Sequence, residues 1–194
     1  RAHLSKAIKP TPEKAPMFCM LLRKHISGSR IIGFEQPDFE RILKIKLECL
    51  DELGFVSEKA LIAEIMGKHS NIILIDRANK ILGSIKHIDF TVSRIRQVLP
   101  GMKYEMPPLQ GKLNPLKVSH SKIIQLMGNS QKNCDKFILD NFTGVSPLNA
   151  REISYKAFGD NEVNISSLDE NERTKLAKHI LKTFYDVGCK NFQP

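Results

Sequence analysis

The chain has 194 residues, of which 41% are hydrophobic and 26% are charged, enough for one sizeable soluble domain or two small ones. No apolar run reaches the roughly 18 residues that a membrane span requires, which argues against a membrane-spanning helix. Because the chain begins with Arg1 rather than Met, we expect a fragment or processed product in which a targeting signal would be invisible.

The chain is strongly basic, with a net charge of +9 and a pI of about 9.4. The excess is +5 in residues 1–50, +1 in residues 51–100 and +3 in residues 101–150, whereas residues 151–194 are balanced. Such an uneven excess fits a phosphate-facing surface. Many basic domains bind no nucleic acid, so the charge alone leaves solubility as the other explanation.

Motifs for catalysis or metal binding are not found in the sequence. It has no GxSxG, GxxxxGK[ST], GxGxxG or HExxH pattern, and no pair of carboxylates stands out as an acid–base dyad. Cys19, Cys49, Cys134 and Cys189 are scattered without CxxC spacing, which indicates ordinary thiols in a reducing compartment. We therefore expect no metal, no cofactor and no enzymatic activity, and a cytoplasmic location.

The first predicted element is an amphipathic helix. Residues 1–15 contain several prolines and predict an extended lead-in, and residues 17–26 then place apolar side chains at helical spacing before a Ser-Gly-Ser stop. Arg23 and Lys24 lie beside this apolar face. They either form the solvated side of a core helix or contact phosphate.

Strands are predicted over residues 31–34, 42–47 and 80–86, with two more in the stretch 59–76. Within that stretch, residues 72–75 are apolar and β-branched and predict a buried strand. The run 61–66 fits a helix face or a strand, and its length and glycine turn favour a strand. The short spacing between strands indicates an antiparallel β-sandwich or meander.

The polar break between the two runs of residues 59–76 is expected to form a turn with Lys68, His69 and Asn71 at its tip. These residues are either turn formers or a nucleic-acid contact.

The second half of the chain is helical in pattern. Residues 87–117 predict a basic, proline-punctuated connector, and the apolar spacing after Val118 predicts helices, the last of which ends near Gly188. In the turn before the third of these helices, Gly144 and Ser146 precede a proline that suits a first helical turn. With Asn149 and Arg151, this turn is either a phosphate site at a helix N-terminus or a tight connection between packed helices.

Five stretches resemble the N-terminal region of the NFACT family, whose members are often labelled fibronectin-binding protein A. They are Pro16–His25, Glu64–Asp76, Ser84–His87, Leu99–Pro108 and Phe142–Leu148, and they occur in the family order. Against the family pattern we expect the first several dozen residues of the domain, and the later coiled-coil and RNA-binding modules, to lie outside this chain.

The resemblance implies an α+β fold. A β-rich domain over residues 1–105 would be an antiparallel β-sandwich similar to the N-terminal domain of formamidopyrimidine-DNA glycosylases. A linker over residues 106–118 and an all-α helix-hairpin-helix domain over residues 119–194 would follow. The glycosylase chemistry is not implied, because its catalytic amino-terminal segment and cysteine zinc finger are not found in this chain.

The resemblance also implies a role in ribosome-associated quality control. Members of the family bind the large ribosomal subunit obstructed by peptidyl-tRNA and recruit alanyl-tRNA, so that the stalled chain gains an alanine tail. The family's tRNA site includes an Asp-Arg pair, and the matching position here is Glu40-Arg41, one methylene longer in the acid. Arg41 would contact phosphate or a base edge while Glu40 orients it, with Arg23 and Lys24 as further tRNA contacts.

Two other functions remain open. The family label suggests an adhesin that binds fibronectin or fibrinogen, although no repeat, wall-anchor signal or disulfide framework is found. The hairpin turn around Gly144 also suggests binding of duplex DNA.

Overall fold

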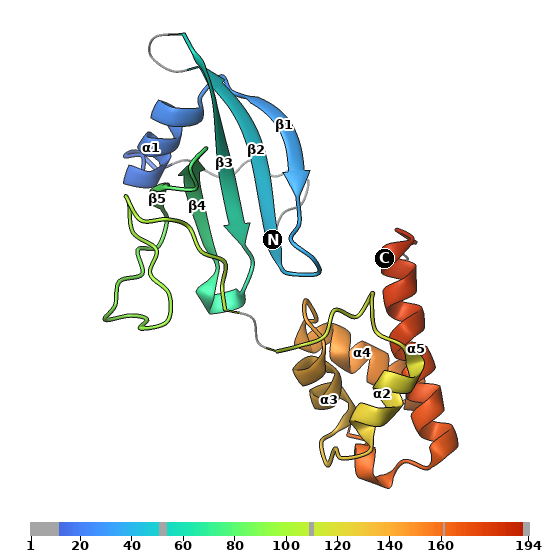
Figure 1. Ribbon diagram of the computed structural model, residues 1–194. Coiled ribbons are helices and arrows are strands. Elements are labelled where there is room, and N and C mark those ends of the chain that lie inside the picture. Colours follow the sequence, from blue (N-terminus) through green and yellow to red (C-terminus); the bar gives the residue numbers. More distant parts are fainter. Residues whose placement is uncertain (1–11, 51–53, 109–110, 161, 192–194) are drawn as a thin grey trace. The chain divides into compact units, whose positions relative to one another are not determined.

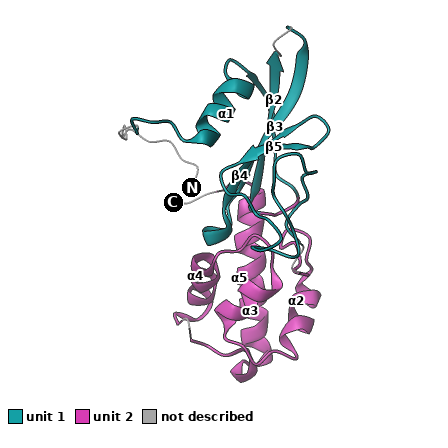
Figure 2. Ribbon diagram, turned by 90° about the vertical axis from the view of Figure 1, so that its left-hand side faces the viewer, with its two compact units in different colours: residues 1–37, 41–108 teal, residues 38–40, 109–194 magenta. Residues whose placement is uncertain are grey.

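The computed structural model describes residues 12–50, 54–108, 111–160 and 162–191. The chain forms two compact units (Figure 2). Unit 1 consists of residues 1–37 and 41–108, and unit 2 consists of residues 38–40 and 109–194. The three-residue segment 38–40, which we predicted in the β-rich domain, therefore belongs with the helices.

The described part of unit 1 contains one α-helix, a short 3₁₀ segment and one sheet (Figure 1). Its elements are α1 (Met17–Ile26), β1 (Arg30–Glu35), β2 (Ile42–Leu50), β3 (Val56–Glu64), β4 (Asn71–Asp76) and β5 (Ile81–Ser84). The strands are antiparallel in the order β1-β2-β3-β4-β5, which confirms the predicted meander and the strand over residues 61–64. The α+β class is confirmed. Among the described residues there is one sheet, so the second layer of a sandwich and the glycosylase likeness stay predictions.

The sheet buries apolar side chains on both faces, because successive residues of a strand point to opposite sides. Ile62, Ile73 and Ile75 form a core on one face with Val98, which follows the sheet in the sequence. On the other face, Leu21 of α1 packs onto β5 at Gly83, where an added Cβ would lie 2.6 Å from Leu21 Cδ1. This close approach explains a glycine within a strand.

Unit 2 is a set of helices, among which the start of one after Ser146 and the end of the last at Gly188 agree with the prediction. They are α2 (His120–Met127), α3 (Cys134–Asn141), α4 (Pro147–Phe158), the 3₁₀ turn η2 (Ile165–Ser167) and α5 (Glu170–Gly188). The hydroxyl of Ser146 accepts a hydrogen bond from the backbone N–H of Asn149, and Asp169 forms a capping box with Glu172. No helix in the described parts of the chain is long and apolar enough to cross a membrane.

The buried core of unit 2 is mostly aliphatic and includes three phenylalanines. Phe142 contacts both Phe137 and Phe184, with ring centroids 6.5 and 6.3 Å apart. The described end of the predicted linker, residues 111–118, is bound to this unit rather than free. Leu113 N donates to Asn141 O at 2.8 Å, next to the start of the turn that leads to α4.

Candidate nucleic-acid interface

The β3–β4 turn, which lies in the matched stretch Glu64–Asp76, is closed by Glu64 and Asn71. These two residues are directly opposed across β3 and β4. The turn between them contains the 3₁₀ segment η1 (Gly67–His69), in which Lys68 and His69 are exposed. The predicted strand–turn–strand arrangement with a basic tip is confirmed.

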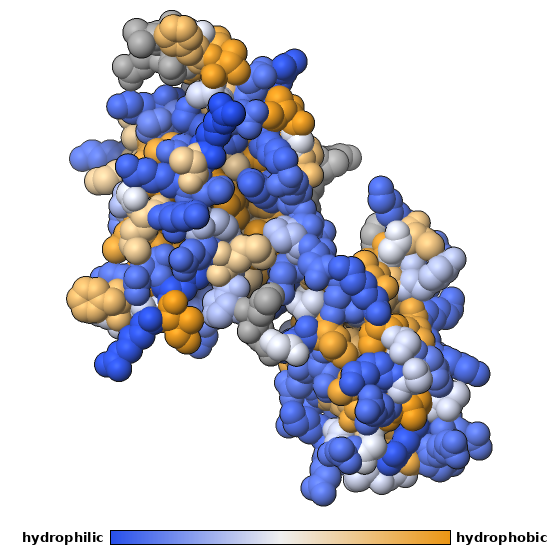
Figure 3. All heavy atoms as spheres, viewed as in Figure 1, coloured by the Kyte–Doolittle hydropathy of each residue, from blue (hydrophilic) through white to orange (hydrophobic). Residues whose placement is uncertain are grey.

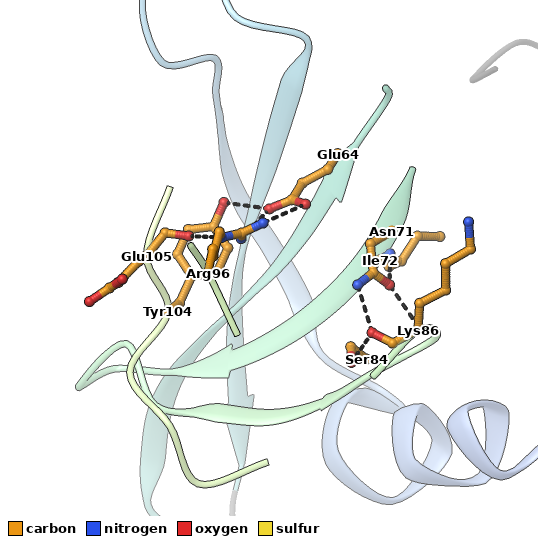
Figure 4. A network of polar contacts seen from close by, with 8 residues as sticks. All are labelled: Glu64, Asn71, Ile72, Ser84, Lys86, Arg96, Tyr104 and Glu105. Carbon is orange, nitrogen blue, oxygen red and sulfur yellow. Dashed lines mark hydrogen bonds and ion pairs between the residues drawn. The ribbon is translucent and has the colours of Figure 1, made fainter. Parts of the chain in front are cut away.

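Contrary to the prediction, Asn71 does not lie at the tip of this turn. It begins β4, and only 3% of it is exposed. Its side-chain Nδ2 donates to Lys86 O at 2.8 Å, and its Oδ1 accepts from Lys86 N at 2.9 Å (Figure 4). The Asn71 amide thus pairs with the backbone N–H and C=O of Lys86 as a neighbouring strand would. These hydrogen bonds allow the polar side chain to be buried.

Lys86 is a further residue of this site that the sequence pattern alone does not indicate, although it lies in the matched stretch Ser84–His87. Its exposed side chain extends to the β3–β4 turn, where Nζ donates to Lys68 O at 2.8 Å. Asn71 thereby links the two motif stretches, and Lys86 is added to the basic tip.

Glu64 is a buried carboxylate with three side-chain hydrogen bonds. Arg96 binds it with both terminal nitrogens, at 2.6 and 3.1 Å, and Tyr104 Oη donates to Glu64 Oε1 at 3.0 Å. The side chains of Glu64 and Arg96 are 2% and 10% exposed. Arg96 Nε also donates to Glu105 O at 2.7 Å (Figure 4).

This network fixes the segment that follows β5 to the end of β3. The Arg96 guanidinium carbon also lies 5.2 Å from the centre of the Tyr104 ring. Burial, reinforced by the Glu64 carboxylate, raises the pKa of Tyr104 above its usual value. Since the donors to Glu64 are fixed in place, this carboxylate serves a structural role.

Arg41 lies at the same end of the sheet. Its carbonyl oxygen accepts a hydrogen bond from Ile65 N at 2.8 Å, which places it beside the β3–β4 turn. Its side chain is exposed, and among the residues that the structure describes it has no hydrogen bond or ion pair.

We call this end of unit 1 the basic end. It consists of Arg41, Lys68, His69, Lys86 and His87, all of them exposed. Within the described ranges, no carboxylate forms a hydrogen bond or ion pair with any of these five side chains. The five residues come from three separate parts of the chain.

The other predicted tRNA contacts are Glu40, which directly precedes Arg41 in the sequence, and Arg23 and Lys24 of α1. Glu40 belongs to unit 2, where its Oε1 accepts a hydrogen bond from Thr143 Oγ1 at 2.7 Å. Its role in orienting Arg41 stays a prediction. Arg23 and Lys24 lie exposed in the last turn of α1, and Arg23 Nη1 lies 3.8 Å from Met20 Sδ.

The turn before α4 has a packing role. Gly144 has a φ of +73°, and a Cβ there would lie 2.3 Å from Phe39 O. The Ser146 hydroxyl caps α4, and Arg151 Nε lies 3.9 Å from Asp135 Oδ2. This packing accounts for the glycine without a ligand, so phosphate binding by Gly144, Ser146, Asn149 and Arg151, like the helix-hairpin-helix assignment, stays a prediction.

Among the described residues, no group of three or more His, Cys, Asp or Glu is arranged to hold a metal ion. The four cysteines are free, and burial raises the pKa of the Cys134 thiol to about 11.

A family model for the NFACT N-terminal and middle domains matches residues 1–194. The Rqc2 homolog RqcH of Bacillus subtilis (strain 168) is 41% identical over 195 residues, which cover 100% of this chain and 32% of that protein. The Rqc2 homolog RqcH of Streptococcus suis (strain 05ZYH33) is 37% identical over 155 residues, which cover 79% of this chain and 28% of that protein. The chain thus spans about a third of the length of these relatives.

Two solved structures are also similar to this chain. The N-terminal region of the fibronectin/fibrinogen-binding protein from Streptococcus suis superposes with a TM-score of 0.70 at 32% identity, covering 94% of this chain and 62% of that one. The fibrinogen-binding protein from Staphylococcus aureus superposes with a TM-score of 0.69 at 31% identity, covering 89% of this chain and 59% of that one. From the full-length family match and these relatives, we conclude that the chain belongs to the NFACT family.

Proposed function

We propose that this chain is an RNA-binding part of a cytoplasmic ribosome-quality-control factor. In this role it helps to bind the large ribosomal subunit obstructed by peptidyl-tRNA and to recruit alanyl-tRNA for alanine tailing. The kinship with proteins named Rqc2 homolog RqcH supports the process. The net charge of +9 supports RNA as the ligand.

The observation that carries this proposal is the basic end of unit 1. Arg41, Lys68 and Lys86 lie far apart in the sequence, yet their strands and turns meet at one end of the sheet. Cations without a carboxylate partner are available to phosphate oxygens, and the planar guanidinium of Arg41 suits phosphate or a base edge. The fixed positions of Asn71 and Lys86 reduce the ordering cost of binding.

We further propose that the chain is not an enzyme and that peptide-bond formation belongs to the ribosome. The buried carboxylate nearest the basic end, Glu64, is held by Arg96 and Tyr104 and is therefore poorly placed to transfer protons.

The direct test is a titration of the 194-residue chain with labelled tRNA at several salt concentrations. Arg41→Ala, Lys68→Ala and Lys86→Ala should each weaken tRNA binding by about threefold to tenfold. Each should also reduce the slope of the logarithm of the binding constant against the logarithm of the salt concentration by about one. The matched control is Arg77→Ala, because Arg77 is exposed in the β4–β5 turn at the opposite end of the same sheet. Equal losses for Arg77 and Arg41, or salt-insensitive binding, would contradict the site.

The cellular arm uses the same substitution. Arg41→Ala in the source organism should reduce tRNA co-purification and alanine tails on stalled chains, whereas Arg77→Ala should not. Unchanged tailing would refute the role of Arg41.

A second candidate function is binding of fibronectin or fibrinogen, because the similar solved structures carry those names. Recovery of the native protein in ribosomal fractions of a sucrose gradient would favour the first function, and recovery at the cell surface would favour the second. Titration of duplex DNA beside tRNA tests the remaining possibility, DNA binding by the α3–α4 turn.

A further inference from the structure

An ordered loop follows β5 in unit 1. Its base is closed by two backbone hydrogen bonds between Ile88 and Val98, at 3.1 and 2.7 Å. Inside the loop, Asp89 Oδ1 accepts from the backbone N–H groups of Thr91 and Val92, and Ser93 N donates to Asp89 O at 2.9 Å. The Thr91 hydroxyl, as the largest cause, and the backbone N–H groups of Val92 and Thr91 donate to the Asp89 carboxylate and hold its pKa below the usual value.

This loop exposes large apolar side chains. Phe90 is 72% exposed, Val92 70% and Ile95 78%, and Arg94 between them is also exposed. Hydrophobic residues do occur singly on protein surfaces, and Figure 3 shows orange residues set among blue ones on both units. Three such residues within six positions of a hydrogen-bonded loop indicate a contact surface.

The loop starts and ends at the basic end. At its start, Lys86 is held by Asn71, and at its exit, Arg96 is held by Glu64. Asn71 and Glu64 are directly opposed across β3 and β4. The loop therefore leaves the sheet beside the same turn that carries Lys68.

We propose that this loop binds an unpaired nucleotide of an RNA ligand. The ring of Phe90 stacks on the base, the aliphatic side chains of Val92 and Ile95 contact its edges or ribose, and Arg94 contacts an adjacent phosphate. This assignment rests on the proposed RNA-binding function and specifies its ligand class as RNA with unstacked bases, since the bases of a duplex are covered by stacking.

The charges near the loop favour RNA over a protein partner. Of the four Lys or Arg in the stretch 84–108, Arg96 is paired with Glu64, and Lys103 bridges to Lys80 at the other end of the sheet. Lys86 and Arg94 remain beside the loop, and the β3–β4 turn adds Lys68 without an acid. The acid within the loop, Asp89, is engaged by its own backbone turn. An aromatic ring flanked by cations is the combination that single-stranded nucleic acid requires.

The test compares a short single-stranded RNA with a blunt RNA duplex of the same length. Phe90→Ala should weaken single-strand binding about tenfold or more, with a much smaller effect on the duplex, and Phe90→Tyr should retain the affinity. Phe55→Ala is the control, because Phe55 is 67% exposed at the opposite end of the sheet. Since the chain has no tryptophan, Phe90→Trp adds a single indole whose fluorescence should be quenched by the single strand.

The outcomes separate this proposal from the function on which it rests. If Arg41→Ala weakens binding while Phe90→Ala does not, and the indole is not quenched, the loop proposal fails and RNA binding stands. If the unaltered chain binds neither RNA, the proposed function fails as well. Loss of a protein contact in Phe90→Ala, with RNA affinity unchanged, would overturn the loop proposal in favour of a protein partner.

Discussion

The buried pair of Glu64 and Arg96 gives the sharpest prediction about unit 1. Arg96→Met keeps an unbranched apolar chain but removes both hydrogen bonds to a carboxylate that is only 2% exposed. Tyr104 Oη would then be the remaining side-chain donor to that carboxylate. Breaking a buried ion pair by removing one partner costs about 3–5 kcal/mol. We expect a loss of this size in the free energy of unfolding of unit 1.

The assay is urea unfolding followed by circular dichroism, with a double-mutant cycle. In the double variant Glu64→Gln/Arg96→Met no charge is left buried, and the introduced amide keeps an oxygen for Tyr104. We expect it to regain at least half of the loss, because removal of both charges is often close to neutral. The control is Arg30→Met, whose partner Glu48 lies at 2.8 Å in a pair with side chains 74% and 34% exposed. Arg30→Met should lower the free energy of unfolding by less than about 1 kcal/mol.

Two results would refute this reasoning. If Arg96→Met costs no more than Arg30→Met, water must reach Glu64 in solution. If the double variant is as unstable as Arg96→Met, packing of the arginine stem, and not the charge pair, stabilises this region.

Three further predictions concern other parts of the chain. Gly144 and Gly159 both have a φ of +73°, but an added Cβ would clash with a neighbour only at Gly144. Gly144→Ala should therefore lower the melting temperature clearly more than Gly159→Ala. Equal shifts in melting temperature would exclude the clash. A maleimide at about pH 8 should modify the exposed Cys189 in the native protein and leave Cys134 intact, as peptide mass mapping would show. Because the pKa of Tyr104 is raised, the folded state keeps the phenol proton to a higher pH than the unfolded state. The free energy of unfolding should therefore fall as the pH rises above about 10. In alkaline urea titrations, Tyr104→Phe should remove the contribution of this residue to the fall.

Local sequence patterns predicted most of the secondary structure. The helix over residues 17–26, the strand–turn–strand unit around Gly67 and the cap at Ser146 follow from spacing and capping rules that act within a few residues. Asn71 was misplaced because polar residues near a glycine usually form the turn itself. Its burial depends on Lys86, a partner 15 residues away.

The composition of a candidate site could be predicted only in part. Lys68, His69 and Arg41 were selected from the sequence, and their exposure agrees with a binding role. Lys86 was missed because an isolated lysine at a strand end carries no signal of its own. At Gly144, packing against Phe39, more than 100 residues earlier, accounts for the glycine, so a phosphate site in this turn stays a prediction.

By itself the sequence determined the α+β class, the ends of several helices, the basic character and the membership of the NFACT family, because these depend on composition, periodicity and ordered motifs. The tertiary structure decided which cations meet. Strand pairing places Glu64 opposite Asn71, and these two residues fix the loop that carries Phe90 beside the turn that carries Lys68. Such pairing joins residues far apart in the chain, and no local pattern encodes its partners.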